Sequence, residues 1–310
     1  MDMTTRELTF ASSDGYELAG ELVLPAGPPP YVAATLQQGS VLANRDGQMP
    51  RTEFRSTLYR RLARMFAQRG VATFRYDKRQ WDIPAPKALT YSLTDRVNDL
   101  VAGFHVMREQ EEIDASNSSL IGHSEGGVIV QLAALELNPE RIAVLASPAK
   151  SLLETMSWRV RRNRMAKTLS RRKSGIIQQT GIDLLIHKLE SDEDFTPEEF
   201  EKFKSEQGSK SAIQGWESWA WFKEHHALKI TDTTVKLPCP SLFIHGDRDY
   251  TVSIENLETY RNVAIESKRD DLICEEMSNL GHFLEDTTRK AFTVNEKLVD
   301  RVAKWLLEKS

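Results

Sequence analysis

Short apolar segments alternate with longer amphipathic stretches along most of this chain, and that alternation constrains the fold more than any other feature. The apolar segments are largely bounded by turn residues, and they lie at 32–38, 71–76, 118–123, 142–147 and 241–245. Such segments are typical of strands buried on both faces of a sheet. Stretches such as 53–68 and 95–110 carry apolar residues at helical spacing. The pattern predicts an α/β fold with a mostly parallel central sheet flanked by helices.

Two further segments near the N-terminus differ from these, because polar and apolar residues alternate along them. Residues 7–11 and 16–24 flank the turn tripeptide Ser13-Asp14-Gly15. This arrangement predicts an antiparallel hairpin, which we expect at one edge of the sheet.

The alternation breaks after Ser147-Pro148. Residues 149–235 carry helical patterning without a convincing strand, and the strand pattern then returns. We interpret 149–235 as a helical cap (lid) inserted into a core domain formed by 1–148 and 236–310. The cap holds four of the six tryptophans, and we assign Trp216 and Trp219 to a substrate cavity, although core packing explains either one equally well.

The chemistry-bearing motif is Gly122-His123-Ser124-Glu125-Gly126, which matches G-x-S-x-G. It follows the apolar segment at 118–121 and precedes the helical run 128–137, the strand-to-helix context in which this motif exposes a nucleophilic serine. The alternative is a plain glycine-rich turn with an idle serine. We predict that Ser124 is a nucleophile.

A nucleophilic serine needs a base and an acid, which in this fold follow it in the order Ser, Asp or Glu, His. Among the seven histidines, His282 has the right order and follows the last predicted strand, 271–277. Asp247 and Asp249 both lie on the loop after the strand at 241–245, and either could be the acid while the other caps a helix. The residues alone leave that choice open.

Outside the cap, the chain resembles α/β-hydrolase-fold serine esterases, the capped bacterial esterases that are related to the hydrolase domains of prolyl oligopeptidase-type peptidases. The resemblance rests on the loop Gln38-Gly39-Ser40 with Asn44-Arg45-Asp46-Gly47, on Arg75-Tyr76-Asp77-Lys78-Arg79, and on the G-x-x-D-x-x-V pattern at 246–252. It implies an α/β-hydrolase fold with a catalytic triad of Ser124, Asp249 and His282. Asp247 is the runner-up acid.

The resemblance also implies an oxyanion hole made by the backbone N–H groups of Ser40 and Glu125. The chain departs from its relatives at Gln37-Gln38, where many have His-Gly, and at Gln80-Trp81, where a glycine-rich continuation is usual. We place Trp81 tentatively at the substrate pocket; packing beneath the loop is the equal alternative. The charged residues near 45–46 and 77–79 are expected to pin loops through salt bridges.

Composition and local charge limit the partners. A formal net charge of −4 and a pI near 6.0 give no overall attraction to nucleic acid or anionic membrane. The basic stretch 159–173 suits an anionic substrate such as an acyl-CoA, or RNA, but a solvated helix face is the better interpretation. No metal-ligand spacing, nucleotide-binding motif, export signal or membrane-spanning run appears. We expect a soluble, cytoplasmic protein without cofactor or metal.

These features predict a serine hydrolase of the carboxylesterase type that cleaves a small-molecule ester through an acyl-enzyme. Hydrolysis of an acyl-CoA or another thioester is the first alternative. A non-catalytic small-molecule-binding homologue of the same fold is the second, and nucleic-acid binding through 159–173 comes third. We expect no nucleic-acid or membrane partner. The sequence leaves open the substrate, a homo-oligomeric state and movement of the cap.

Overall fold

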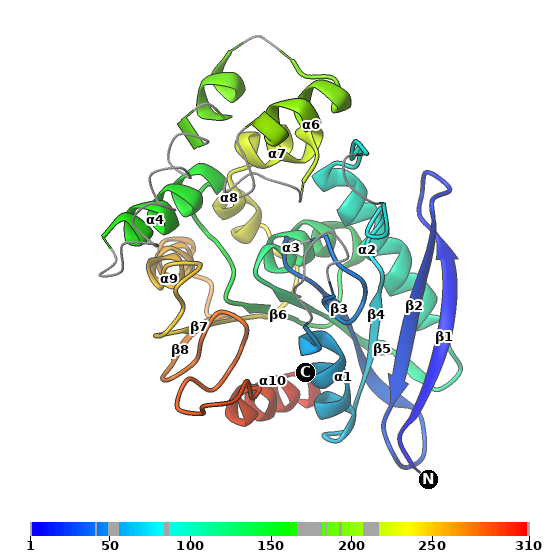
Figure 1. Ribbon diagram of the computed structural model, residues 1–310. Helices are drawn as coiled ribbons and strands as arrows, with labels where there is room; N and C mark the ends of the chain where they lie inside the picture. The colour runs from blue at the N-terminus through cyan, green and yellow to red at the C-terminus, as the bar shows by residue number, and fades with distance from the viewer. Residues whose placement is uncertain are drawn as a thin grey trace.

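The computed structural model describes residues 2–308 apart from 41, 49–55, 84–86, 166–181, 184, 192–193 and 207–216. Its centre is an eight-stranded sheet in the order β1-β2-β4-β3-β5-β6-β7-β8 (Figure 1). The strands are β1 (Thr4–Ala11), β2 (Glu17–Leu24), β3 (Tyr31–Gln37), β4 (Val71–Tyr76), β5 (Ile113–His123), β6 (Ile142–Leu145), β7 (Ser241–Gly246) and β8 (Leu272–Met277).

The sheet is antiparallel at one edge and parallel elsewhere. β1 pairs with β2 and β2 with β4 in antiparallel register, whereas β3 to β8 pair in parallel. The predicted N-terminal hairpin and the predicted parallel sheet are both confirmed. The parallel strands bring their carboxyl ends to the same edge, so the loops that follow β3, β5, β7 and β8 converge there.

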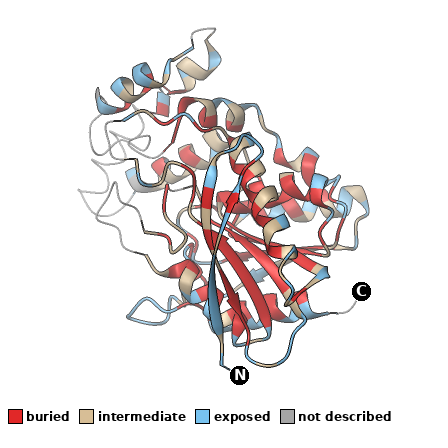
Figure 2. Cartoon of the chain, turned by 90° about the vertical axis from the view of Figure 1, so that its right-hand side faces the viewer, coloured by how far each residue is buried: buried red, intermediate tan, exposed pale blue. Residues whose placement is uncertain are grey.

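Two hydrophobic clusters cover the two faces of the sheet. Successive strand residues point to opposite faces, so Leu120 joins one cluster and Ile121 the other. Helices α2 (Leu93–Arg108), α3 (Glu125–Leu137) and α9 (Glu255–Ser267) pack in the first cluster. Helices α1 (Leu58–Ala67) and α10 (Glu296–Leu307) pack in the second. The central strands are therefore buried on both sides (Figure 2).

Between β6 and β7 the described residues form helices and no strand. They include α4 (Leu152–Arg164), α6 (Pro197–Glu206), α7 (Trp219–Ala227) and α8 (Ile230–Thr234); α6 and α7 lie at the top of the molecule in Figure 1, and α4 lies at the left. This agrees with the helical patterning of 149–235, while the division into core and cap at those boundaries stays a prediction. Among the described residues, no helix is long and apolar enough to cross a bilayer.

Some element boundaries differ from those predicted. β5 begins at Ile113, where polar residues at 114–118 hid the start of the strand, and β6 ends at Leu145 instead of residue 147. The C-terminal helix begins only after Asn295, whose side chain accepts a hydrogen bond from the backbone N–H of Leu298. Residues 286–295, before that helix, form a loop held by the isolated bridges Leu280–Asp286 and Glu285–Val294.

Candidate active site

Ser124 sits in a strained turn between β5, which ends at His123, and α3, which begins at Glu125. Its backbone has φ 57° and ψ −125°, a conformation that non-glycine residues rarely adopt. The glycines of the motif make room for this turn. A Cβ on Gly126 would lie 2.3 Å from the carbonyl oxygen of Gln37, and one on Gly122 would lie 2.3 Å from that of Gly126. The turn thus packs directly on the end of β3.

His282 and Asp249 form a hydrogen-bonded pair, with 2.8 Å between His282 Nδ1 and Asp249 Oδ2. The carboxylate can only accept this bond, so Nδ1 carries the hydrogen and Nε2 is left as the basic nitrogen. Ser124 Oγ and His282 Nε2 are not hydrogen-bonded to each other in the structure. The His282 ring lies beside the ring of His123, the residue that precedes Ser124, with 5.2 Å between ring centroids. A longer separation before substrate binds is common for catalytic pairs.

Asp249 is held as a carboxylate by four donors. Its Oδ1 accepts from the backbone N–H groups of Thr251 and Val252, each at 2.8 Å, and its Oδ2 lies 3.2 Å from His245 Nε2 in addition to His282. Burial opposes ionisation, but the charge of His282 and the hydrogen bonds of His245 and His282 outweigh it. The pKa of Asp249 therefore lies well below its ordinary value.

The runner-up acid, Asp247, has a different role in the structure. Its Oδ1 accepts a hydrogen bond of 2.6 Å from the backbone N–H of Asn279, which ties the loop after β7 to the loop after β8. Asp249, not Asp247, contacts His282.

His123 belongs to a relay of hydrogen bonds that runs from His282 through Tyr59 to Gly39. The sequence did not indicate this role, although His123 lies inside the serine motif. Its Nε2 lies 2.7 Å from the carbonyl oxygen of His282, which can only accept, so Nε2 donates. Burial and the neighbouring charge of His282 lower the pKa of His123 to about 3, so the ring is neutral and its Nδ1 accepts from Tyr59 Oη at 2.8 Å. Tyr59 Oη in turn accepts from Gly39 N at 2.9 Å. The relay joins the loops that carry Ser40, Ser124 and His282.

Arg96 links the two residues expected to supply the oxyanion hole. Its Nη1 donates to the carbonyl oxygen of Ser40 at 3.2 Å and to Glu125 Oε2 at 2.6 Å. Its Nη2 donates to Glu217, which lies in the predicted cap, at 2.9 Å. Lys78 Nζ also donates to the carbonyl oxygen of Gly39, and burial together with the charge of Arg96 lowers the pKa of Lys78 to about 7. These contacts fix the backbone of Ser40 relative to that of Glu125.

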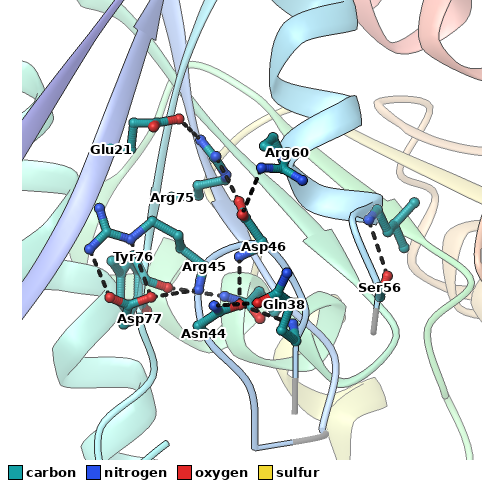
Figure 3. A network of polar contacts seen from close by, with 12 residues as sticks. Glu21, Gln38, Asn44, Arg45, Asp46, Ser56, Arg60, Arg75, Tyr76 and Asp77 are labelled. Atoms are coloured by element: carbon teal, nitrogen blue, oxygen red, sulfur yellow. Dashed lines mark hydrogen bonds and ion pairs between the residues drawn. The ribbon is translucent and has the colours of Figure 1, made fainter. Parts of the chain in front are cut away.

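Salt bridges hold the rest of the loop after β3, as predicted for the charged residues near 45–46 and 77–79. Figure 3 shows Arg45 bonded to Asp77, at 2.7 Å, and Asp46 bonded to Arg75, at 2.9 Å. Arg75 is buried and also pairs with Glu21 at 2.6 Å. The loop is therefore anchored to the end of β4, and Arg75 of β4 is paired in turn with β2.

The two departures from the related esterases both have structural counterparts. Gln37 and Gln38 are buried and bond to Tyr76, Gln37 through the tyrosine hydroxyl and Gln38 to its backbone oxygen at 3.0 Å. Gln80 adopts φ 59°, a value that glycine adopts most easily. Its side chain bonds both the hydroxyl and the backbone N–H of Thr90, at 2.7 and 3.0 Å, which holds the strained residue in place.

A cavity of about 130 Å³ opens beside Ser124. Ser40 and Glu125 line it, together with residues of α3, α4, α7 and the loop after β7. Its apolar lining consists of Val128, Pro148, Leu152, Met156, Trp221, Phe222, Leu228, Ile230 and Val252. A concave, mostly apolar site with a few polar groups is typical of small-molecule binding.

The tryptophans predicted for the pocket lie elsewhere or outside the described residues. Trp219 packs edge-on against Phe195, with ring centroids 5.0 Å apart, and its indole N–H bonds Asp194, so it is not among the cavity residues. Trp81 packs half-buried against the first hydrophobic cluster and is not among the residues that line the cavity. Trp216 lies outside the described residues. Trp221, two positions after Trp219, lines the cavity instead and bonds Glu125.

Glu217 is a buried acid at this cavity with one unpartnered oxygen. Its Oε2 is bonded by Arg96 and Tyr91, whereas its Oε1 has no hydrogen-bond partner among the described residues. Burial raises the pKa of Glu217 to about 8, because Arg96 is shared with Glu125 and compensates only part of the desolvation. In contrast, the pKa of Glu125 is lowered, since the charge of Arg96 and the contact with His225 outweigh its burial.

This raised pKa predicts that Glu217 destabilises the folded protein increasingly as the pH rises. Between pH 4.5 and about 8 the folded protein keeps a proton that the unfolded chain has lost, so rising pH favours unfolding. Glu217→Gln cannot lose a proton. We expect the variant to become more stable than the wild type as the pH rises. Within that window, the difference between their free energies of unfolding should increase by up to about 1.4 kcal/mol per pH unit. Urea denaturation at pH 5, 6.5 and 8 measures the difference, and a constant difference would contradict the buried neutral acid.

Within the described parts of the chain, no cluster of three or more His, Cys, Asp or Glu side chains could hold a metal ion. The polar residues that line the cavity include Ser124, Glu125, Glu217, Thr155 and Arg159.

Comparison with curated proteins and solved structures finds similar chains. Esterase EstD from Thermotoga maritima is 22% identical over 299 residues, 94% of this chain, and the chain spans 66% of the EstD length, just under two thirds. The esterase domain of a Rhodothermus marinus protein aligns with a TM-score of 0.56 at 16% identity and covers 98% of each chain. Pyrococcus furiosus esterase Pf2001 aligns with a TM-score of 0.58 at 14% identity, and the alignment covers 98% of this chain and 90% of that chain. At these identities the solved structures show a shared fold.

Comparison with protein-family models identifies the family of this chain. Residues 53–275 match the model of the family described as serine aminopeptidase, S33. The match includes the elbow around Ser124 and the acid loop with Asp249, and His282 follows it in the chain. Together with the eight-stranded sheet, this confirms the resemblance seen in the sequence: the chain belongs to the serine aminopeptidase S33 family of α/β-hydrolases.

Proposed function

We propose that this protein is a serine hydrolase that cleaves a carboxylic ester of a small molecule through Ser124, His282 and Asp249. The observation that carries the proposal is the Asp249–His282 pair behind the strained turn of Ser124, at the edge of a mostly apolar cavity. The names of the similar proteins support it, since EstD and the two solved relatives are called esterases.

In the proposed mechanism, His282 Nε2 takes the proton of Ser124 as Oγ attacks the acyl carbon. Asp249 keeps Nδ1 protonated and stabilises the imidazolium that forms. The tetrahedral intermediate collapses when His282 returns the proton to the departing alcohol. Water, deprotonated by the same nitrogen, then attacks the acyl-enzyme and releases the acid and Ser124.

The backbone N–H groups of Ser40 and Glu125 are the proposed oxyanion donors. One such donor is typically worth about 10²- to 10³-fold in rate, provided that its position is fixed before the reaction. Arg96 donates hydrogen bonds to both residues, and Gly39 is bonded to Tyr59 and Lys78. These contacts hold the two backbone N–H groups in place. In this view 149–235 act as a cap, because α4 and α7 contribute one wall of the cavity.

A matched substrate panel tests the reaction class. We expect wild-type protein to hydrolyse p-nitrophenyl esters of short and medium acyl chains faster than acyl-CoA thioesters or p-nitroanilides of the same acyl groups. Faster turnover of the thioesters would replace ester by thioester hydrolysis. The absence of turnover with any member of the panel would favour a non-catalytic binding protein.

A further inference from the structure

One face of helix α4 lines the cavity beside Ser124. The residues on that face are Leu152, Thr155, Met156 and Arg159, spaced i, i+3, i+4 and i+7. Leu152 and Met156 are apolar, whereas Thr155 and Arg159 bring a hydroxyl and a guanidinium to this face of the helix. By contrast, Arg161 and Arg164 of the same basic stretch are solvent-exposed, and residues 166–173 of that stretch lie outside the described residues.

The Arg159 guanidinium lacks a counter-charge among the residues that the structure describes. Arg162, three positions later, stacks over the ring of Tyr250 at 3.9 Å, whereas Arg159 makes no ion pair, hydrogen bond or ring contact with another described residue. Burial alone shifts the pKa of Arg159, and it shifts it downward. Arg159 is only partly exposed, and a cation that has lost part of its hydration is stabilised by a nearby anion, so a ligand with a negative charge would bind favourably beside it.

Thr155 adds a second unpartnered polar group, one helical turn before Arg159 on the same face. Its hydroxyl is buried and has no hydrogen-bond partner among the described residues. A hydroxyl and a guanidinium side by side offer donors that converge on a single acceptor group.

The other ionisable side chains that line the cavity already have ionisable partners. Glu125 and Glu217 share Arg96, at 2.6 and 2.9 Å, and His225 also contacts Glu125 at 3.0 Å. Lys150 pairs with Glu255 at 2.5 Å. Of the charged lining residues that the structure describes, Arg159 alone lacks such a pairing.

We propose that Arg159, assisted by Thr155, binds a carboxylate carried by the substrate itself. The proposal rests on the function proposed above and specifies it: the preferred substrates are small esters with one anionic end, either half-esters of dicarboxylic acids or esters of hydroxy acids. A guanidinium matches a carboxylate with two parallel N–H donors, and its single charge suits a monoanion.

Two substrate pairs distinguish the acyl side from the alcohol side. Monomethyl adipate and methyl hexanoate differ by a carboxylate on the acyl chain. The ester 6-acetoxyhexanoate and hexyl acetate differ by a carboxylate on the alcohol. We expect wild-type kcat/KM to favour the anionic member of one pair, and glutarate and suberate homologues then give the preferred length.

The variant Arg159→Gln should lower kcat/KM for the anionic ester by about 10- to 100-fold, the usual range for losing a hydrogen-bonded charge, and leave the neutral ester within about twofold. Arg159→Lys should recover part of the loss. Arg162→Gln is the matched control, because it removes a charge from the same helix at a residue outside the cavity lining, and it should leave the anionic preference intact.

Equal effects of Arg159→Gln on anionic and neutral esters would overturn the subsite, and so would a wild type without anionic preference in either pair. If the wild type cleaves no ester at all, the proposed function fails separately. Calorimetric binding of adipate then decides the subsite: binding that Arg159→Gln abolishes supports it, and binding that is absent or unchanged in the variant overturns it.

Discussion

The variant Asp249→Asn should lose about 10⁴-fold in kcat while it keeps the wild-type fold. Asp249 Oδ2 accepts the hydrogen of His282 Nδ1 at 2.8 Å, which leaves Nε2 free to take the serine proton. An asparagine that turns its amide N–H₂ toward His282 favours the opposite tautomer, with the hydrogen on Nε2. Steady-state hydrolysis of the best ester of the panel measures the loss, and circular dichroism checks the fold.

Asp247→Asn is the matched control on the same loop. Its side chain accepts one backbone N–H, from Asn279, and an asparagine oxygen can still accept that bond. We expect kcat to remain within a few-fold of wild type. Equal losses in both variants would mean that loop integrity, and not the tautomer of His282, explains the effect.

Gly126→Ala should prevent stable folding or cost more than about 4 kcal/mol, a size reserved for severe clashes. The new Cβ would lie 2.3 Å from the carbonyl oxygen of Gln37 and 2.7 Å from that of Gln38. Both are backbone atoms at the end of β3, so either the turn around Ser124 or the loop that carries Ser40 would have to move. Soluble yield and urea denaturation report the loss.

The control for this prediction is Gly103→Ala in helix α2. There the new Cβ would lie 3.3 Å from a ring atom of Phe74, a contact that small shifts can relieve. Alanine also favours a helix over glycine by about 0.5–1 kcal/mol. We expect the free energy of unfolding to change by less than about 1 kcal/mol. Wild-type stability of Gly126→Ala would contradict the close packing of the elbow on β3.

Hydrophobic patterning was sufficient to predict the sheet. Strands such as 71–76 and 241–246 are buried on both faces and read as continuous apolar runs, and 71–76 agrees with the structure residue for residue. The prediction for β5 is five residues too short, because residues 114–117 near its start are partly or fully exposed and mostly polar, a pattern typical of a loop.

The order of motifs was sufficient to propose the triad, but the local sequence could not separate Asp247 from Asp249. Two residues apart on one loop, they differ only in which bond each accepts, and that depends on how the loop after β8 folds back. The family pattern chose Asp249, and the hydrogen bond to His282 supports that choice.

The surroundings of the site could not be read from the sequence, because they depend on contacts between distant segments. Arg96 stands in an ordinary amphipathic helix, yet it bonds Ser40, Glu125 and Glu217. Trp219 and Trp221 differ by two positions on one short helix, which turns them to different sides: one packs among phenylalanines and the other lines the cavity.

The most direct test of the account is covalent labelling of Ser124. Wild-type protein is incubated with a fluorophosphonate and digested, and the adduct is located by tandem mass spectrometry. We expect one adduct, on Ser124, formed in parallel with loss of ester hydrolysis, and neither labelling nor turnover in a folded Ser124→Ala variant. An adduct at another residue, or turnover that persists in Ser124→Ala, would contradict the assignment of Ser124 as the nucleophile.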